Sequence, residues 1–208
     1  MSRDHILHRV RTGIGRSAGQ PPGDPPPVRL RIPEMDLARR IASMIERVEA
    51  LAGKAYCETD PRAFVAGAME GKTAVASNAP FLAECGIPNL PGIAGGFLDS
   101  AALRQACAST AVGITSADYA LADTGTLVLL SSREEARMIS LLPPAHIAVV
   151  PAGRILTGLD ELFTVLPHPA RSTSSMVTIT GPSRTGDIEM TLVRGVHGPG
   201  ELTVIVVG

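Results

Sequence analysis

Short apolar segments alternate with helix-like segments along the first half of the chain, and this alternation restricts the fold more than any other feature. Strand-like runs lie at 55–57, 73–77 and 110–114. Between them the sequence predicts helices at 60–70 and 99–107. Strands separated by helices of about ten residues indicate βαβ units. The chain is therefore expected to fold as an α/β domain around a parallel sheet.

The strongest helical pattern lies at 34–52, where apolar residues recur at spacings of three and four and Gly53 is expected to be the C-cap. A weaker helix is predicted at 3–16. Five prolines between residues 18 and 27 separate the two helices, which is typical of a linker. The sequence thus predicts a helical arm and Pro-rich linker over residues 1–33, and a single domain over residues 34–208.

The pattern changes after residue 117. Strand-like segments at 119–122 and 126–130 are separated by a short turn, which predicts a hairpin or a strand with a tight bend. A helix is expected to begin at Thr157 or Gly158. Further strands are expected at 147–150, 175–180 and 202–207. The sheet is therefore expected to include an antiparallel or mixed section.

Composition excludes several classes of function. The 208 residues carry a net charge of −1 and only 3% aromatic residues, so neither a basic field nor base-stacking platforms point to nucleic acid. Residues 1–40 are locally basic, with eight arginines against four acidic residues. This excess fits either a solvated arm or an arm that docks on an acidic partner.

Cysteine usage bears on compartment and cofactor. Three widely spaced cysteines, without a signal-peptide pattern, indicate reduced thiols and a cytoplasmic protein. A [4Fe–4S] cluster ordinarily takes four thiolates, so no such cluster is expected on this chain alone. Flavin and nicotinamide fingerprints are absent, and no apolar run is long enough to span a membrane. We therefore expect no cofactor and no membrane span.

Three ordered motifs stand out in the second half. They are Asp123-Thr124-Gly125-Thr126, Ser140-Leu141-Leu142-Pro143 with His146-Ile147, and Gly181-Pro182-Ser183 through Glu189 with Gly195-Val196-His197-Gly198-Pro199. Together they resemble the LUD domain family, and within it the lactate utilization protein C subgroup. The resemblance is densest from about residue 110 onward.

The resemblance carries implications for fold and role. It implies a fold similar to the NagB/RpiA/CoA-transferase superfamily. It also implies a role beside iron–sulfur-type partner proteins in the oxidation of L-lactate to pyruvate. No catalytic residue is carried over from the family, so candidate residues must be judged on their own chemistry.

The segment from Gly181 to Gly186 has the features of an anion-binding cradle. Ser183 and Thr185 offer hydroxyl groups, Arg184 offers a guanidinium, and the glycines allow backbone N–H groups to approach a ligand. The spacing matches neither a Walker loop nor a dinucleotide fingerprint. An alternative is that Ser183 and Thr185 cap a following helix, with an acidic residue in its first turn.

Other polar residues complete the predicted site. Asp123, Thr124 and Gly125 are expected to form a turn that also lines the cleft. The candidates for acid–base or nucleophilic chemistry are Asp187, Glu189 and His197, because carboxylates and imidazole are the usual groups for such work. His146 is a weaker candidate. No metal site is expected, because His5 and His8 on the arm have no further ligand nearby.

These observations predict a component of a lactate oxidation system that carries no cluster itself, and that binds a small anionic ligand or assists assembly. The alternative is a stand-alone enzyme of the same superfamily, acting on a phosphorylated or acyl-CoA substrate. In that case Asp187 or Glu189 would be the nucleophile or base.

Overall fold

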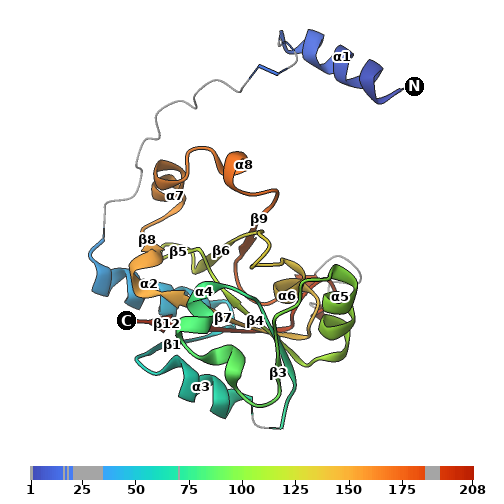
Figure 1. Cartoon of the computed structure of the whole chain (residues 1–208). Helices are drawn as coiled ribbons and strands as arrows, with labels where there is room; N and C mark the ends of the chain where they lie inside the picture. Colours follow the sequence, from blue (N-terminus) through green and yellow to red (C-terminus); the bar gives the residue numbers. More distant parts are fainter. Residues whose placement is uncertain (1, 16, 18, 21–34, 70, 186–192) are drawn as a thin grey trace.

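The computed structural model describes residues 2–15, 17, 19–20, 35–69, 71–185 and 193–208. At its centre lies a six-stranded sheet with the order β1-β12-β7-β4-β2-β3, in which neighbouring strands are parallel (Figure 1). The strands are β1 (Lys54–Glu58), β2 (Ala74–Ala76), β3 (Ile93–Ala94), β4 (Val112–Ser116), β7 (Ala145–Pro151) and β12 (Glu201–Val207). The parallel sheet predicted from the alternating segments is thus confirmed.

A smaller, mixed sheet has the order β8-β5-β6-β9. Strands β5 and β6 form an antiparallel hairpin, β9 pairs antiparallel with β6, and β8 pairs parallel with β5. A separate two-stranded ladder joins β10 and β11. The bounds are β5 (Tyr119–Leu121), β6 (Thr126–Leu130), β8 (Ile155–Leu156), β9 (Met176–Ile179), β10 (Arg184–Thr185) and β11 (Val193–Arg194). The predicted hairpin and mixed section are therefore confirmed.

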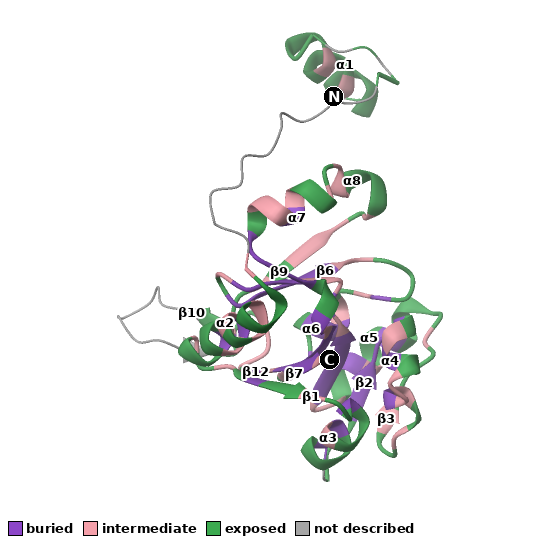
Figure 2. Ribbon diagram, turned by 90° about the vertical axis from the view of Figure 1, so that its left-hand side faces the viewer, coloured by how far each residue is buried: buried purple, intermediate pink, exposed green. Residues whose placement is uncertain are grey.

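Helices cover both faces of the central sheet and the outer face of the smaller one. Helices α3 and α4 pack on one face of the central sheet. The opposite face is covered by α2 and the smaller sheet, and towards β2 by α5 and α6. Figure 2 shows that buried residues concentrate on the strands between these layers. The helices are α2 (Leu37–Ala50), α3 (Pro61–Ala68), α4 (Pro80–Glu84), α5 (Ser100–Ser109), α6 (Met138–Leu141), α7 (Leu159–Val165) and α8 (Pro169–Ser172), with 3₁₀ turns η1 (Ile87–Asn89) and η2 (Ala152–Arg154).

Three of these helices begin at an aspartate that caps them. The side chain of Asp60 accepts a hydrogen bond from the backbone N–H of Ala63 at 2.9 Å, and that of Asp99 accepts one from Ala102 at 2.7 Å. Asp36 caps α2 in the same way, through the N–H of Arg39 at 2.8 Å. Each carboxylate satisfies an N–H that has no partner within the helix. Local side-chain chemistry thus fixes where these helices start.

The C-terminus of α2 differs from the expectation. Ala52, and not Gly53, is the left-handed residue, with φ 64°. The N–H groups of Ala52 and Gly53 donate to the carbonyls of Glu49 and Val48, at 2.8 and 3.0 Å, which is the Schellman pattern with an alanine at the left-handed position. Gly53 serves another purpose, because a Cβ there would lie 2.8 Å from the Val48 side chain.

Gly113 lets α6 approach the centre of the sheet. A Cβ on Gly113 would overlap the backbone carbonyl of Ile139, and it would also crowd Pro143. Backbone atoms cannot move aside as a flexible side chain can. The close approach of α6 to β4 therefore requires a glycine at this position.

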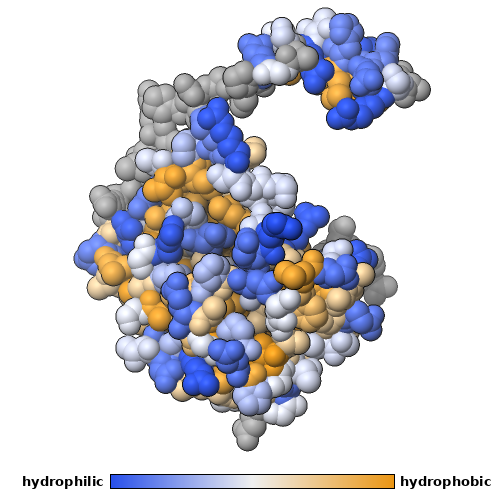
Figure 3. All heavy atoms as spheres, viewed as in Figure 1, coloured by the Kyte–Doolittle hydropathy of each residue, from blue (hydrophilic) through white to orange (hydrophobic). Residues whose placement is uncertain are grey.

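The arm carries helix α1 (Arg3–Gly13), which has no buried residue. Its surface is mostly hydrophilic in Figure 3, whereas apolar side chains gather in patches over the body. Residues 21–34, which include the prolines of the predicted linker, lie outside the described residues. Over the described ranges, none of the helices has the length and apolar character needed to cross a bilayer.

Candidate functional site

The predicted turn at Asp123–Gly125 packs against α2. Gly125 has φ 69°, and a Cβ there would lie 2.8 Å from Arg47 Cβ. The turn therefore requires a glycine both for its backbone conformation and for its close contact with α2. The hydroxyl of Thr124 hydrogen-bonds to that of Thr126 at 2.8 Å, and Thr126 to Thr180 at 2.8 Å. This chain of hydroxyls connects the turn to the start of the Gly181 segment. The structure thus brings two of the three motifs together.

The Gly181 segment also contacts α2. Gly181 has φ 86°, and a Cβ on it would lie 3.0 Å from Leu51 Cβ. The guanidinium of Arg184 donates a hydrogen bond to the backbone carbonyl of Leu51, at the C-terminal end of α2. A cation there is favourable because helix C-termini carry partial negative charge. Arg184 is therefore already engaged by the protein.

The rest of the predicted segment is extended where it is described. Arg184 and Thr185 form β10, so Ser183 precedes a strand and caps no helix there. Gly186, Asp187 and Glu189 lie outside the described residues, as does the helix considered after Gly186. The assignments of these residues to a binding or catalytic site stay predictions.

Ser183 and His197 meet at a cavity of about 200 Å³ near the amino ends of β7 and β12. We call it the amino-end pocket, and His146 lies in its lining. Arg184 and the turn at 123–125 are not among the residues that line it. The lining residues are Ser140, Leu141, His146, Val177, Thr178, Ile179, Thr180, Gly181, Pro182, Ser183, His197, Gly198, Pro199 and Leu202.

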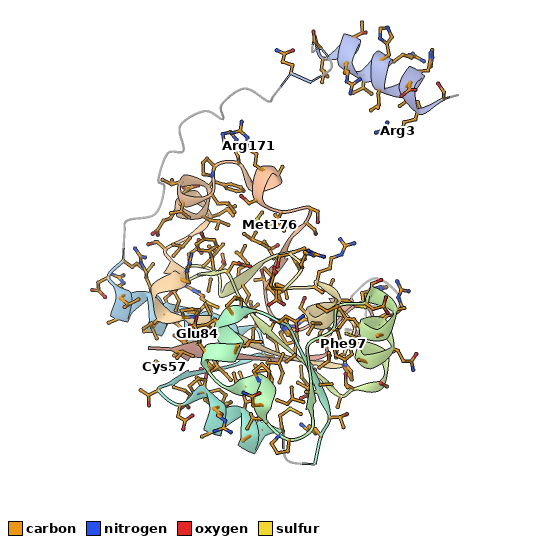
Figure 4. The ribbon with its side chains drawn as sticks, viewed as in Figure 1. Arg3, Cys57, Glu84, Phe97, Arg171 and Met176 are labelled. Atoms are coloured by element: carbon orange, nitrogen blue, oxygen red, sulfur yellow. The ribbon has the colours of Figure 1, made fainter. Side chains whose placement is uncertain are left out.

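A larger cavity of about 480 Å³ opens at the carboxyl ends of β4 and β7. It lies between α4 and the β5–β6 hairpin, and Glu84, labelled in Figure 4, stands on α4. We call it the carboxyl-end pocket. In sheets of this kind ligands bind outside the carboxyl ends of the strands. The lining residues are Ala79, Pro80, Phe81, Glu84, Ser116, Ala117, Asp118, Tyr119, Leu130, Ser132, Glu134, Glu135, Pro151 and Arg154.

Glu135 is the most unusual residue of the carboxyl-end pocket. It is only 5% exposed. The Ser77 hydroxyl and the backbone N–H of Ser116 both donate to its Oε2, at 2.7 and 3.1 Å. Its Oε1 has no hydrogen-bond partner among the described residues. Burial raises the pKa of Glu135 to about 8, against the hydrogen bonds from Ser77 and Ser116, which lower it. At neutral pH the carboxyl group is therefore mainly protonated, and Oε1 is the atom free to carry the proton.

Asp118 and Arg154 lie beside Glu135 in the same pocket. The pKa of Asp118 is raised by burial, while the N–H of Leu130, which donates to its Oδ2 at 2.7 Å, and the charge of Arg154 lower it. Arg154 lies over the ring of Tyr119, 5.4 Å from the centroid. The pocket thus combines a cation with two carboxyl groups of raised pKa, a combination that recurs at sites of proton transfer.

The sequence did not single out this site. Glu135 stands in the polar run Ser131-Ser132-Arg133-Glu134-Glu135-Ala136-Arg137, where any acidic residue looks solvated. Only the sheet order brings Ser77 and Ser116 to its carboxylate. A metal centre finds no support: the described residues hold no cluster of three or more His, Cys, Asp or Glu side chains fit to bind an ion.

Comparison with known proteins gives a family and several relatives. The model of the LUD domain matches residues 35–207. Two proteins named lactate utilization protein C, from Halalkalibacterium halodurans and Bacillus subtilis, are 43% and 41% identical to the chain over 100 residues. Each match covers 46% of this chain, and 44% and 42% of those proteins. The chain thus aligns with less than half the length of these curated relatives.

A solved structure shares the fold. It is the crystal structure of a duf162 family protein from Deinococcus radiodurans, which is 21% identical and superposes with a TM-score of 0.63. The match covers 84% of this chain and 99% of that one. At this identity the likeness extends to the arrangement of helices and strands.

Proposed function

Since this chain belongs to the LUD domain family, we propose that it acts in lactate utilization and binds a small anionic ligand of that process in the carboxyl-end pocket. The relatives named lactate utilization protein C support the process. The pocket itself supports the ligand.

The observation that carries the proposal is the arrangement of the Glu135 carboxyl group. Two donors hold Oε2, so the proton resides on Oε1, which has no partner among the described residues. A protonated carboxyl donates a strong hydrogen bond to a ligand oxygen. It also accepts a proton once it is ionised. Glu135 can therefore hold the hydroxyl or carbonyl oxygen of a 2-hydroxy or 2-oxo acid and exchange a proton with it.

Arg154 supplies the charge that an anion requires. The pocket also holds Glu84 and Glu134, both exposed, which lie where water screens them. Arg154 is the cation among the lining residues. We infer that the ligand's carboxylate pairs with Arg154 while its second oxygen meets Glu135. Arginine suits this because its planar fork binds a carboxylate through two parallel hydrogen bonds.

Titration calorimetry with L-lactate and pyruvate tests the proposal on the purified full chain. We expect binding of at least one of them, and a loss of about tenfold in affinity in Glu135→Ala or Arg154→Ala, the weight of one charge-assisted hydrogen bond. Glu49→Ala, an exposed position on α2, is the matched control and should bind as the unmodified chain does.

Growth provides a second measurement. A strain that depends on this chain for growth on L-lactate should grow with Glu49→Ala and fail or slow with Glu135→Ala. Normal growth with Glu135→Ala, together with unchanged binding, would remove the carboxyl-end pocket from the proposal.

The resemblance to the family also supports iron–sulfur-type proteins as partners of this chain. Those partners, and not this chain, would carry out the electron transfer. Their co-purification with a tagged form of this chain tests this part. Recovery of partner subunits that carry iron and inorganic sulfide supports it. Recovery of the chain alone from cells grown on L-lactate, with those subunits present in the lysate, contradicts it.

One observation favours the stand-alone enzyme as a second candidate. A buried carboxyl group with a pKa of about 8 is suited to general acid–base catalysis near neutral pH. In that case the purified chain by itself should turn over an acyl-CoA or a phosphorylated sugar, and Glu135→Gln should abolish the turnover. A chain that is silent alone and active only with its partners favours the first proposal.

The segment Gly181–Glu189 is retained as a separate proposal for an anion site. Its Ser183 lines the amino-end pocket, whereas the Arg184 guanidinium contacts Leu51 outside that pocket. If Arg184 binds a ligand, Arg184→Ala should weaken growth on L-lactate and leave the melting temperature nearly unchanged. If Arg184 serves α2, the variant should melt earlier and grow normally.

A further inference from the structure

The amino-end pocket and the pocket of Glu135 lie at opposite ends of the strands of the central sheet. The chemistry of their lining residues also differs. Its lining includes two histidines and several hydroxyl-bearing residues. It includes no Asp, Glu, Lys or Arg among the described residues. A charged molecule that entered it would lose hydration without gaining a counter-charge. The lining therefore favours an uncharged occupant.

His146 is the residue that this pocket leaves incomplete. It is 1% exposed, and its Nε2 is 2.8 Å from the Thr115 hydroxyl. Its Nδ1 has no hydrogen-bond partner among the residues that the structure describes. Buried polar atoms in native proteins are nearly always paired. An unpaired buried ring nitrogen therefore calls for a partner that the described protein groups do not supply.

The strand pattern directs the imidazole towards this pocket. Successive side chains on a strand face opposite sides of the sheet. His146 shares its face with Ala148 and Val150, which pack in the core beneath α2 together with Leu202. Leu202 also lines the amino-end pocket. Ile147, on the other face, packs with the layer of α3 and α4.

The rim of the pocket is held in place by backbone hydrogen bonds. The N–H of Ser183 donates to the carbonyl of Pro199 at 2.8 Å, and the N–H of Gly195 donates to the carbonyl of Ser183 at 3.1 Å. These bonds fix Ser183 between two turns of the segment that carries His197. Both backbone polar groups of Ser183 are thus hydrogen-bonded within the protein. Its hydroxyl group belongs to a residue that lines the cavity.

We propose that the amino-end pocket is a second binding site, which takes a small uncharged molecule whose carbonyl or hydroxyl oxygen hydrogen-bonds to His146 Nδ1. In this proposal the Thr115 hydroxyl is the donor to Nε2, so that Nδ1 carries the ring proton and donates it to the ligand. The Ser183 hydroxyl contacts the same polar group, and Leu141, Val177 and Leu202 cover the apolar part. The cavity of about 200 Å³ limits the occupant to a few heavy atoms. This site is separate from the pocket of Glu135.

Two isosteric probes separate an uncharged occupant from an anionic one. L-lactamide and L-lactate differ in charge and hardly in shape. Nitrogen NMR of the labelled full chain follows the His146 ring nitrogens during titration with each. We expect L-lactamide to shift Nδ1 and to saturate, and L-lactate to leave the ring nitrogens unshifted at the same concentrations.

Variants locate the response. Ser183→Ala, which keeps the backbone bonds of the rim, should weaken L-lactamide binding by about tenfold, the weight of one hydrogen bond. His146→Phe should abolish it, with His5→Phe on α1 as the matched control. If His146→Phe does not fold, the affinity of Ser183→Ala for L-lactamide by itself tests whether the molecule binds in this pocket.

The outcomes distinguish this proposal from the one for Glu135. L-lactamide binding that persists in Glu135→Ala supports a separate site, whether or not L-lactate binds elsewhere. The proposal is overturned if L-lactate shifts His146 Nδ1 as strongly as L-lactamide does. It is also overturned if L-lactamide leaves Nδ1 unshifted up to its solubility limit.

Discussion

At the carboxyl ends of the parallel strands, the pocket around Glu135 is lined by four acidic side chains and Arg154, whereas the described lining of the pocket at the amino ends contains no Asp, Glu, Lys or Arg. Each contains one buried titratable group, Glu135 or His146. Burial shifts the two pKa values in opposite directions, upward for the carboxyl and downward for the imidazole. Both groups are therefore mainly neutral at pH 7, so each can hydrogen-bond to a ligand without the cost of a buried charge.

The two pockets depend on neighbouring residues of β4. Thr115 contacts His146 through its hydroxyl, and the next residue, Ser116, donates its backbone N–H to Glu135. Helix α6, which lines the amino-end pocket, follows directly on the segment that carries Glu135. A substitution in β4, or one that disturbs its contact with α6, should therefore alter both pockets. A substitution of Glu135 or His146 should alter only the pocket that contains it.

The largest effect is expected from Gly113→Ala, which would disturb both pockets at once. The new Cβ would overlap the carbonyl of Ile139, so β4 and α6 would have to separate. We expect a loss of more than about 4 kcal/mol in unfolding free energy, at the extreme of single substitutions. Chemical denaturation of the purified variant measures it.

A matched control for that variant is Gly67→Ala in α3. Apart from its chain neighbours and the backbone of its own helix, no heavy atom of the described residues would lie within 4 Å of a Cβ at Gly67. Alanine is the better helix former, so this variant should gain up to about 1 kcal/mol. Equal stability of the two alanine variants would show that α6 does not need to lie so close to β4.

Glu135→Gln should change how stability depends on pH. The folded protein holds the Glu135 proton up to a pKa of about 8, against an ordinary value of 4.5 for a free glutamate. Between these values the folded state binds more protons than the unfolded state, so unfolding free energy falls as pH rises. Glutamine has no proton to lose and should flatten this decline.

Melting curves between pH 5 and about pH 8 check this, since each kcal/mol corresponds to roughly 2–4 °C in a chain of this size. The variant should melt several degrees above the unmodified chain at the alkaline end and approach it at the acid end. Parallel curves for the two proteins would show that Glu135 ionises as freely as an exposed glutamate.

A smaller effect of opposite sign is expected at His146. Burial lowers its pKa from 6.5 to about 4, so the unfolded state binds more protons between these values. Stability should therefore fall as pH drops from about 6.5 to 4. His146→Phe should lose this part of the acid sensitivity, whereas His5→Phe should keep it. The acid limb of a pH series of melting temperatures is the measurement, and an unchanged limb in His146→Phe speaks against a buried neutral imidazole.

The smallest effect is expected from removal of residues 1–27, because those of them that the structure describes line neither pocket. Helix α1 buries none of its residues, so its loss removes little apolar contact. The melting temperature should stay within a few degrees of that of the full chain. A collapse of the fold, seen by circular dichroism, would show that the arm completes the core or an interface.

The sequence predicted what local chemistry decides. The helices predicted at 60–70 and 99–107 begin at Asp60 and Asp99, because each carboxylate accepts a hydrogen bond from an N–H only three residues away. The hairpin at 119–130 followed from its turn residues in the same way. The prediction that Gly53 ends α2 was wrong. Gly53 is required for close packing against Val48, and Ala52 is the residue that takes the left-handed conformation, with φ 64°.

The sequence did not predict what the sheet order decides. Ser77 donates to Glu135 across 58 positions and Ser116 across 19, and neither separation has a periodic signature. Arg184 shows that a residue type alone does not predict what its side chain contacts. Its residue type suits an anion, but the direction of its side chain depends on where α2 ends, and its guanidinium contacts Leu51.

The position of β12 within the central sheet has a consequence for synthesis on the ribosome. β1 pairs only with β12 in this sheet, with Lys54 opposite Thr203. β12 in turn separates β1 from β7. The emerging chain must therefore keep β1 without its neighbouring strand in this sheet until residues 201–207 have been made. Such late, long-range pairing slows folding and leaves the edge of an unpaired strand open to aggregation during synthesis.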